Sequence, residues 1–179
     1  MRIMALDASL SSTGYAIFDT ELADFTHVDR IRTSIKKATP TTAKRIESIV
    51  TQLSHLMFWN AVDIILIEDI YVGQLQASSV IPLAMLRGAI QETVYGLDYD
   101  TLWVSQSSKI KKEVVGKGNA SKQDVYDLVK DKYSYSSVVK EALGDELISK
   151  TGPDKNEDKS DAVALIDGYL SNPSIVYPA

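Results

Sequence analysis

Two short apolar runs open the chain, and a polar turn separates them. Residues 2–7 read RIMALD and residues 14–19 read GYAIFD, and the residues between them are mostly serine and threonine. Apolar runs of this length bounded by small polar residues are typical of strands, so the pattern predicts a hairpin. A weaker third strand is predicted at residues 26–33.

The strongest strand signal lies at residues 62–69, which read VDIILIED. The unbroken apolar core of this run indicates a strand that is buried on both faces, as in the centre of a sheet. A further short strand, DTLWVS, is predicted at residues 100–105.

Apolar residues recur at helical spacing in four other segments. The first follows Thr41 or Thr42, either of which can cap a helix, and the second tolerates Pro82 in its first turns. Ser121 and Asp124 have the spacing of a capping box at the start of the third. The predicted helices therefore begin near residue 42 and cover residues 78–95, 121–133 and 158–170.

The order of these elements favours a mixed sheet covered by helices, because the strands of the hairpin come first and helices and strands then alternate. The sequence has no internal repeat, linker or low-complexity segment. We therefore expect the 179 residues to form one domain over residues 1–179.

The formal net charge of −5 hides a strong segregation of charge. Residues 30–45 hold six basic residues and no acid, and residues 109–132 hold seven lysines and four acids, whereas residues 141–158 hold six acids and two lysines. Basic stretches beside an acidic one suit a protein that binds phosphates and also concentrates cations. From charge alone, a solvated surface is the favoured explanation for them.

The chain has no cysteine, which excludes disulfides and thiolate metal sites and suits a reducing cytoplasm. No apolar stretch approaches the roughly 20 residues that span a bilayer, and the first residues lack the pattern of a signal peptide. We expect a location in the cytoplasm of a bacterium or of an infected host cell.

Carboxylates end the two strongest strands and begin the last helix. Asp7 and Glu68 each follow an apolar strand, and sites in α/β sheets form beyond the carboxyl ends of strands. Asp158 and Asp161 are spaced to share one helical face. Acids also favour a helix N-terminus without any further function, so each residue alone is weak evidence.

Together these acids predict a metal site, because converging carboxylates repel one another unless a hard divalent cation such as Mg²⁺ or Mn²⁺ binds them. Two such ions about 4 Å apart can activate water and stabilise the leaving oxygen of a phosphodiester. Asp7 would be the natural bridging ligand. His27 and His55 form no metal-binding pattern, and the sequence has neither a Walker motif nor a G-x-G-x-x-G motif.

Four stretches of the chain resemble, in order, the motifs of the RuvC family of Holliday junction resolvases. They read ALDASLSSTGYAI, LIEDIYVG, KIKKEVVGKGNASKQDV and DKSDAVALI. The resemblance implies an α/β, RNase H-like fold with a mixed five-stranded sheet flanked by helices. It also implies a homodimer that nicks four-way DNA junctions in recombination and repair, with Mg²⁺ or Mn²⁺ and 5′-phosphate products.

The resemblance also implies roles for individual residues. Tyr71 falls where the family carries an aromatic residue that stacks at the opened junction, and Arg87 lies at a matching helix position. Lys109, Lys112 and Lys117 share the basic stretch and complete the predicted DNA-binding set. The residues that match the family's catalytic and metal-binding set are Asp7, Glu68, Asp158, Asp161, Lys111 and Lys122.

Some residues depart from the family pattern. Bacterial members usually have Pro-Gly after the first acid, whereas here Ala8 and Ser9 follow Asp7. Residues 144–157 resemble an acidic insertion, and either Glu157 or Asp158 can be the residue that faces the metal. These departures are similar to those of viral members, in which branches other than a perfect four-way junction can be cut.

Three other functions stay open from the sequence. A junction-binding module without catalysis would share the basic stretches, and a ribonuclease acting on RNA–DNA hybrids would share the metal chemistry. An actin-like ATPase would share the first hairpin, but it needs two lobes, for which the chain leaves little room.

Overall fold

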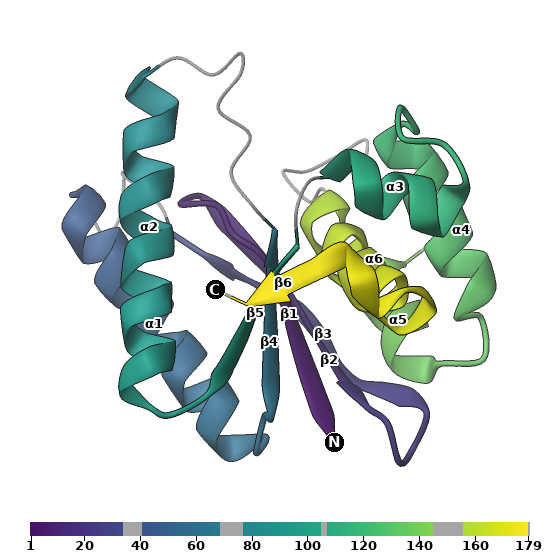
Figure 1. Cartoon of the computed structure of the whole chain (residues 1–179), viewed down its shortest axis with the longest axis horizontal. Helices are drawn as coiled ribbons and strands as arrows, with labels where there is room; N and C mark the ends of the chain where they lie inside the picture. Colours follow the sequence, from purple (N-terminus) through teal and green to yellow (C-terminus); the bar gives the residue numbers. More distant parts are fainter. Residues whose placement is uncertain (34–40, 69–76, 105–106, 145–155, 179) are drawn as a thin grey trace.

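The fold is built on a sheet with helices on both faces (Figure 1). The computed structural model describes residues 1–33, 41–68, 77–104, 107–144 and 156–178. Within these residues the strands form one six-stranded sheet in the order β3-β2-β1-β4-β5-β6. The strands are β1 (Arg2–Asp7), β2 (Ser12–Asp19), β3 (Asp24–Arg32), β4 (Ile64–Glu68), β5 (Asp100–Val104) and β6 (Val176–Pro178).

The sheet is mixed, as the order of the elements predicts. β1 pairs antiparallel with β2 and parallel with β4, which in turn pairs parallel with β5. The predicted hairpin and the strands at residues 26–33, 62–69 and 100–105 are all present. The sheet differs from the expected five strands by β6, a three-residue strand too short to give an alternating pattern.

Helices α1 and α2 cover one face of the sheet, and the remaining helices cover the other (Figure 1). No helix in the described residues is long and apolar enough to cross a membrane. The helices are α1 (Thr42–Trp59), α2 (Ala77–Gly96), α3 (Ser107–Val115), α4 (Lys122–Lys132), α5 (Ser137–Leu143) and α6 (Glu157–Ser171), followed by the 3₁₀ turn η1 (Pro173–Ile175).

The four predicted helices are confirmed, and the capping box at Ser121 and Asp124 opens α4 as expected. The sequence analysis did not predict α3 and α5. Both are short, and each buries only one or two side chains, so their hydrophobic period is too weak to read: Ile110 in α3, and Val139 and Leu143 in α5.

The side-chain alternation along β1 decides where its final acid points. Ile3 and Ala5 pack in the core beneath α6, whereas Met4 and Leu6 pack in the core beneath α1 and α2. Successive strand residues point to opposite faces, so Asp7 points to the α6 face. In β4 the same rule places Leu66, and therefore Glu68, on the α6 face as well.

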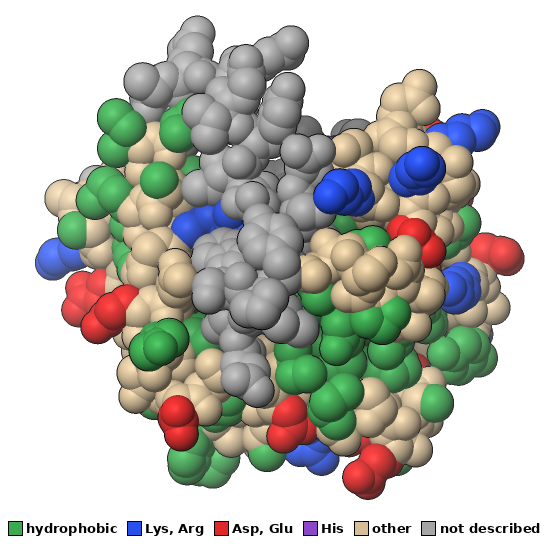
Figure 2. All heavy atoms as spheres, in the orientation of Figure 1, with side chains coloured by type: hydrophobic (Ala, Val, Ile, Leu, Met, Phe, Trp, Pro, Cys, Tyr) green, Lys and Arg blue, Asp and Glu red, His purple; other side chains and the backbone are tan. Residues whose placement is uncertain are grey.

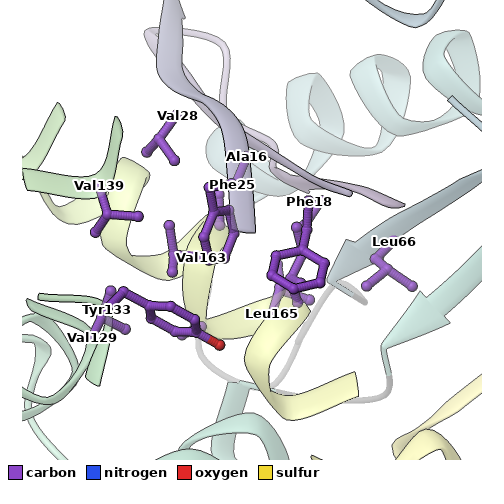
Figure 3. Close-up of a cluster of buried hydrophobic side chains, with 14 of the residues drawn as sticks. Ala16, Phe18, Phe25, Val28, Leu66, Val129, Tyr133, Val139, Val163 and Leu165 are labelled. Atoms are coloured by element: carbon purple, nitrogen blue, oxygen red, sulfur yellow. The ribbon is translucent and has the colours of Figure 1, made fainter. Parts of the chain in front are cut away.

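An aromatic cluster anchors the α6 side of the sheet to the surrounding helices (Figure 3). The rings of Phe18 and Phe25 lie edge to face at 5.1 Å, and the ring of Phe25 meets that of Tyr133 at 4.9 Å. Val163 and Leu165 of α6 fill the space beside them (Figure 3). This packing holds α6 at a defined height above the sheet.

Gly14 sets how closely the first turn of α6 approaches the sheet. It pairs with Asp7 across the β1–β2 ladder, and the backbone carbonyl of Asp158 lies directly over it. A Cβ atom at this position would overlap that carbonyl, so any other residue would push α6 away. The glycine therefore permits the contact that brings the start of α6 over the end of β1.

We expect Gly14→Ala to lower the free energy of unfolding by at least about 2 kcal/mol, because the overlap is with backbone that cannot rotate away. Chemical denaturation monitored by circular dichroism measures this change. The matched control is Gly96→Ala at the end of α2, where a Cβ meets nothing within 4 Å and stability should hold or rise slightly. Equal stabilities for the two variants would contradict this account.

Candidate active site

Four carboxylates from three elements converge where β1 and β4 end. β1 and β4 are parallel, and Leu6 pairs with Ile67, so the next residues, Asp7 and Glu68, lie side by side on the α6 face. Asp158 and Asp161 come from the first turns of α6, directly above. All four residues are partly buried.

The electrostatics show that these acids act on one another. Burial raises the pKa of Asp7 well above its usual value, and Asp161, Glu68 and Asp158 raise it further. Burial also raises the pKa of Asp161 to about 6, against the opposing effect of the Lys122 ammonium. The cluster therefore holds more negative charge than its surroundings neutralise.

Glu68 is held by residues that sequence reasoning did not select. Burial raises its pKa, but the hydroxyl and the backbone N–H of Ser107 donate hydrogen bonds to its carboxylate and act in the other direction. Ser107 begins α3, and serine followed by a polar run is a common start of a helix. That signal locates a helix start, but no local pattern shows that this start faces Glu68.

Arg87 lies beneath the site rather than on the DNA-facing surface. Only 5% of it is exposed, and its guanidinium lowers the pKa of Glu68. A buried arginine does not favour the predicted contact with DNA. Its position instead fits a charge partner that balances Glu68 from the α2 side of the sheet.

The predicted lysines divide into two groups. Lys122 and Lys111 reach the carboxylates: the Lys122 Nζ lies 2.8 Å from Glu157 Oε2 and 3.8 Å from Asp161 Oδ2, and Lys111 acts on the pKa of both Glu68 and Asp161. The others are exposed around α3, where Figure 2 shows basic side chains gathered. These are Lys109, Lys112 and Lys117. Tyr71 lies outside the described residues.

The choice between Glu157 and Asp158 follows from the same contacts. Asp158 raises the pKa of both Asp7 and Asp161, so its carboxylate faces the cluster. Glu157 turns to the Lys122 ammonium instead. The structure thus places Asp158, not Glu157, with the other acids.

A pocket opens beside the acids, between β4, α3 and α6. Its polar wall consists of Glu68, Ser107, Lys111 and Asp161. Its apolar wall consists of Ile110, Val114, Val125 and Ala164. Charged groups that share a pocket with apolar side chains interact more strongly than they would in open water.

The donor chemistry fits a hard divalent cation. Oxygen donors from Asp7, Glu68, Asp158 and Asp161 are what Mg²⁺ and Mn²⁺ prefer, and a cation would relieve the repulsion that, after burial, raises the pKa of Asp7 and of Asp161. Among the residues described, no three carboxylate or imidazole groups already stand as a ready-made ligand set. Closure of the acids on a cation would require side-chain rotation.

Comparison with known proteins agrees with this geometry. The sequence profile of the family described as "Crossover junction endodeoxyribonuclease RuvC" matches residues 3–165. A RuvC of Citrifermentans bemidjiense is 29% identical over 151 residues, which cover 82% of this chain and 88% of that protein. A RuvC of Sulfurovum sp. is 30% identical over 135 residues, which cover 73% of this chain and 79% of that protein.

Solved structures share the fold. Thermus thermophilus RuvC superposes with a TM-score of 0.71 at 14% identity, with 100% of both chains covered. The same protein in complex with a Holliday junction substrate gives 0.70 at 12% identity, covering 100% of this chain and 99% of that chain. Fowlpox virus resolvase, in complex with Holliday junction DNA, gives 0.60 at 15% identity, covering 95% and 97%. These likenesses confirm the predicted RNase H-like α/β fold.

We expect Asp161→Asn to stabilise the metal-free protein at neutral pH. Because the folded pKa of Asp161 is raised to about 6, ionisation of this carboxyl removes stability as the pH rises from about 4 through 6. Asparagine avoids that loss, which is on the order of 1–2 kcal/mol after allowance for solvent and for the lost contact with Lys122. Thermal unfolding in EDTA at pH 7.5 should show a melting temperature about 3–6 °C higher.

The difference in melting temperature between Asp161→Asn and wild type should be smaller at pH 4.5, where the carboxyl of Asp161 in the folded wild type already carries its proton. The control is Glu141→Gln, a substitution of the same type on the exposed surface of α5. A variant that is less stable than wild type at pH 7.5 in EDTA would refute the repulsion argument.

Proposed function

Because the chain belongs to the RuvC family of crossover junction endodeoxyribonucleases, we propose that its four converging carboxylates hydrolyse a phosphodiester bond of branched DNA. Membership of this family makes the chain a structure-selective, junction-resolving endonuclease. The observation that carries the assignment to these residues is their convergence: the parallel pairing of β1 and β4 sets Asp7 beside Glu68, and the start of α6 brings Asp158 and Asp161 above them. A purely structural cluster of acids would be paired with bases instead.

We propose two Mg²⁺ ions per site, for which Mn²⁺ can substitute. Asp7, Glu68, Asp158 and Asp161 would hold them, with Asp7 central to the set. Bound ions of this kind activate water and stabilise the leaving oxygen of the phosphodiester. The preference for Mg²⁺ rests on the all-oxygen donor set.

The remaining residues of the site prepare it for a phosphate. Ser107 and Arg87 oppose the rise that burial causes in the pKa of Glu68, since hydrogen bonds and positive charge favour the carboxylate form. Lys111 and Lys122 supply positive charge at the rim of the acids, where the negative charge of the scissile phosphate develops. An inactive junction-binding module would have no need of this arrangement.

DNA would approach over α3. The exposed lysines Lys109, Lys112 and Lys117 lie on this side, next to the pocket. Contacts of this kind bind phosphates regardless of sequence and weaken as salt rises. Preference for branched DNA over linear duplex would then come from the shape of the substrate at the carboxylates rather than from base contacts. Whether four-way junctions or forks are preferred is left to the cleavage assay.

A homodimer would present two such sites to one junction, and α2 offers the surface for it. Ile81, Met85 and Tyr95 are exposed by 59%, 50% and 82%, and they fall on one helical face. Gly88 lies midway between Ile81 and Tyr95 on this face, and nothing occupies the space above it. A second copy crossing antiparallel at Gly88 would place Ile81 of each chain against Tyr95 of the other.

The cleavage test uses a labelled four-way junction with wild type and Glu68→Gln. Wild type should make paired nicks with Mg²⁺ or Mn²⁺ and none in EDTA. The variant should lose at least about a thousand-fold in cleavage rate, because it removes one oxygen ligand and its charge. It should still bind the junction in a mobility-shift assay, since the exposed lysines are untouched.

Linear duplex, a Y-fork and an RNA–DNA hybrid serve as parallel substrates. Cleavage of forks at the same rate as junctions would indicate a general debranching nuclease. Binding without cleavage by wild type under every metal would leave a junction-binding module, and preferential cleavage of the hybrid would indicate a ribonuclease. The last two results would refute the assignment.

The dimer test uses Met85→Glu, which places a charge on the α2 face. We expect the mass measured by multi-angle light scattering to fall from that of a dimer to the monomer value of 19.7 kDa. The control is Leu22→Glu, at an exposed apolar residue in the β2–β3 turn, and this variant should stay dimeric. A monomeric wild type, or a dimeric Met85→Glu variant, would show that α2 is not the interface.

A further inference from the structure

Glu157 is a fifth acid beside the four carboxylates, and its contact is with Lys122. It begins α6, and its carboxylate accepts a hydrogen bond from the Lys122 ammonium at 2.8 Å. Only 16% of its side chain is exposed, against 51% for Lys122. A carboxylate this sheltered binds a cation more firmly than one on an open surface.

The ammonium of Lys122 needs such a partner because α4, the helix that carries it, does not fix its position. It is the first residue of α4, where the positive end of the helix dipole repels an ammonium. The capping box formed by Ser121 and Asp124 fixes the backbone, but four rotatable bonds leave the ammonium free to move. Position and orientation must therefore come from the acids that it meets.

Two acids compete for this ammonium. Glu157 Oε2 lies at 2.8 Å from Nζ, and Asp161 Oδ2 lies at 3.8 Å. Without Glu157, the attraction of the crowded acids would draw the ammonium toward Asp161, where it would neutralise an oxygen that a metal ion requires. The closer contact with Glu157 keeps the ammonium at the edge of the cluster.

From this geometry we propose that Glu157 is a positioning residue, which holds Lys122 at the rim of the carboxylate cluster for the DNA phosphate and limits its contact with Asp161. The proposal rests on the proposed nuclease function. It differs from a role of Glu157 as a metal ligand, because it acts entirely through Lys122. It also differs from a simple helix-dipole effect, which would change stability and nothing else.

The test is a double-mutant cycle of wild type, Glu157→Gln, Lys122→Gln and the double variant. The first readout is Mn²⁺ affinity without DNA, measured by the electron paramagnetic resonance of free Mn²⁺. Glu157→Gln should weaken Mn²⁺ binding about three- to tenfold, because the released ammonium then competes at Asp161. In the Lys122→Gln background, the same substitution should have no effect.

The second readout is the single-turnover rate of junction cleavage at saturating metal. Glu157→Gln should slow it about 10- to 100-fold, the range typical of residues that orient a functional group. The double variant should be no slower than Lys122→Gln alone. Junction affinity in EDTA should stay within about twofold of wild type, which separates positioning from DNA binding.

Three results would overturn the proposal. If Glu157→Gln weakens Mn²⁺ binding in both backgrounds, Glu157 is a metal ligand. If the effects of the two substitutions on the cleavage rate are additive, Glu157 does not act through Lys122. If Mn²⁺ affinity and cleavage rate are both unchanged, Glu157 only stabilises the end of the helix. Circular dichroism and melting temperature confirm that each variant folds, and Glu141→Gln on α5 is the matched acid-to-amide control. A wild type that does not cleave at all would refute the nuclease assignment instead, while the Mn²⁺ cycle would still test the pairing.

Discussion

The contact between the backbone of Asp158 and Gly14 is the constraint on which the site depends. It lets α6 begin directly above the row of the sheet that Asp7 occupies, so acids distant in the sequence meet. Side chains normally separate a helix from the sheet on which it packs. Here the sheet has no side chain at Gly14, so the backbone of α6 can approach it directly. The strand acids and the helix acids therefore share one patch because a glycine is present, not because they attract one another.

The acids themselves oppose this arrangement, and the apolar core offsets their repulsion. Burial raises the pKa of Asp7, and each of the acids near it raises that pKa further, so the cluster favours a more open structure. Behind it, the middle of α6 is buried in the core, and Phe25 and Tyr133 lock that core from the β3 side. The buried middle of α6 stabilises the fold, so the same helix can be well packed and still carry unfavourable electrostatics at its first turn.

The two strand acids could be predicted because strand alternation is local, and the pairing of β1 with β4 needs only the parallel order of a mixed sheet. The spacing of Asp158 and Asp161 was equally readable. Three features could not be predicted from the sequence: the contact of Ser107 with Glu68, the burial of Arg87 and the choice of Asp158 over Glu157. Each depends on how α2, α3 or α4 packs against the strands. The position of a short element such as α3 is determined by the elements that pack against it, and its own sequence gives little indication of that position.

Charge segregation explains how an acidic chain can act on an acidic polymer. The net charge of −5 is spread over the surface, but the exposed lysines around α3 adjoin the pocket, and Lys111 and Lys122 line the edge of the acids. At distances beyond the screening length of physiological salt, about 8 Å, the rest of the chain has little influence on a bound phosphate. In the proposed function local charges therefore decide the binding: the lysines would attract the DNA strand, and the acids would accept it only where bound cations neutralise them. A phosphate that is held at the lysines but misplaced over the acids would be repelled, so under the proposed function the cluster would hold the metal and also select the geometry of the substrate.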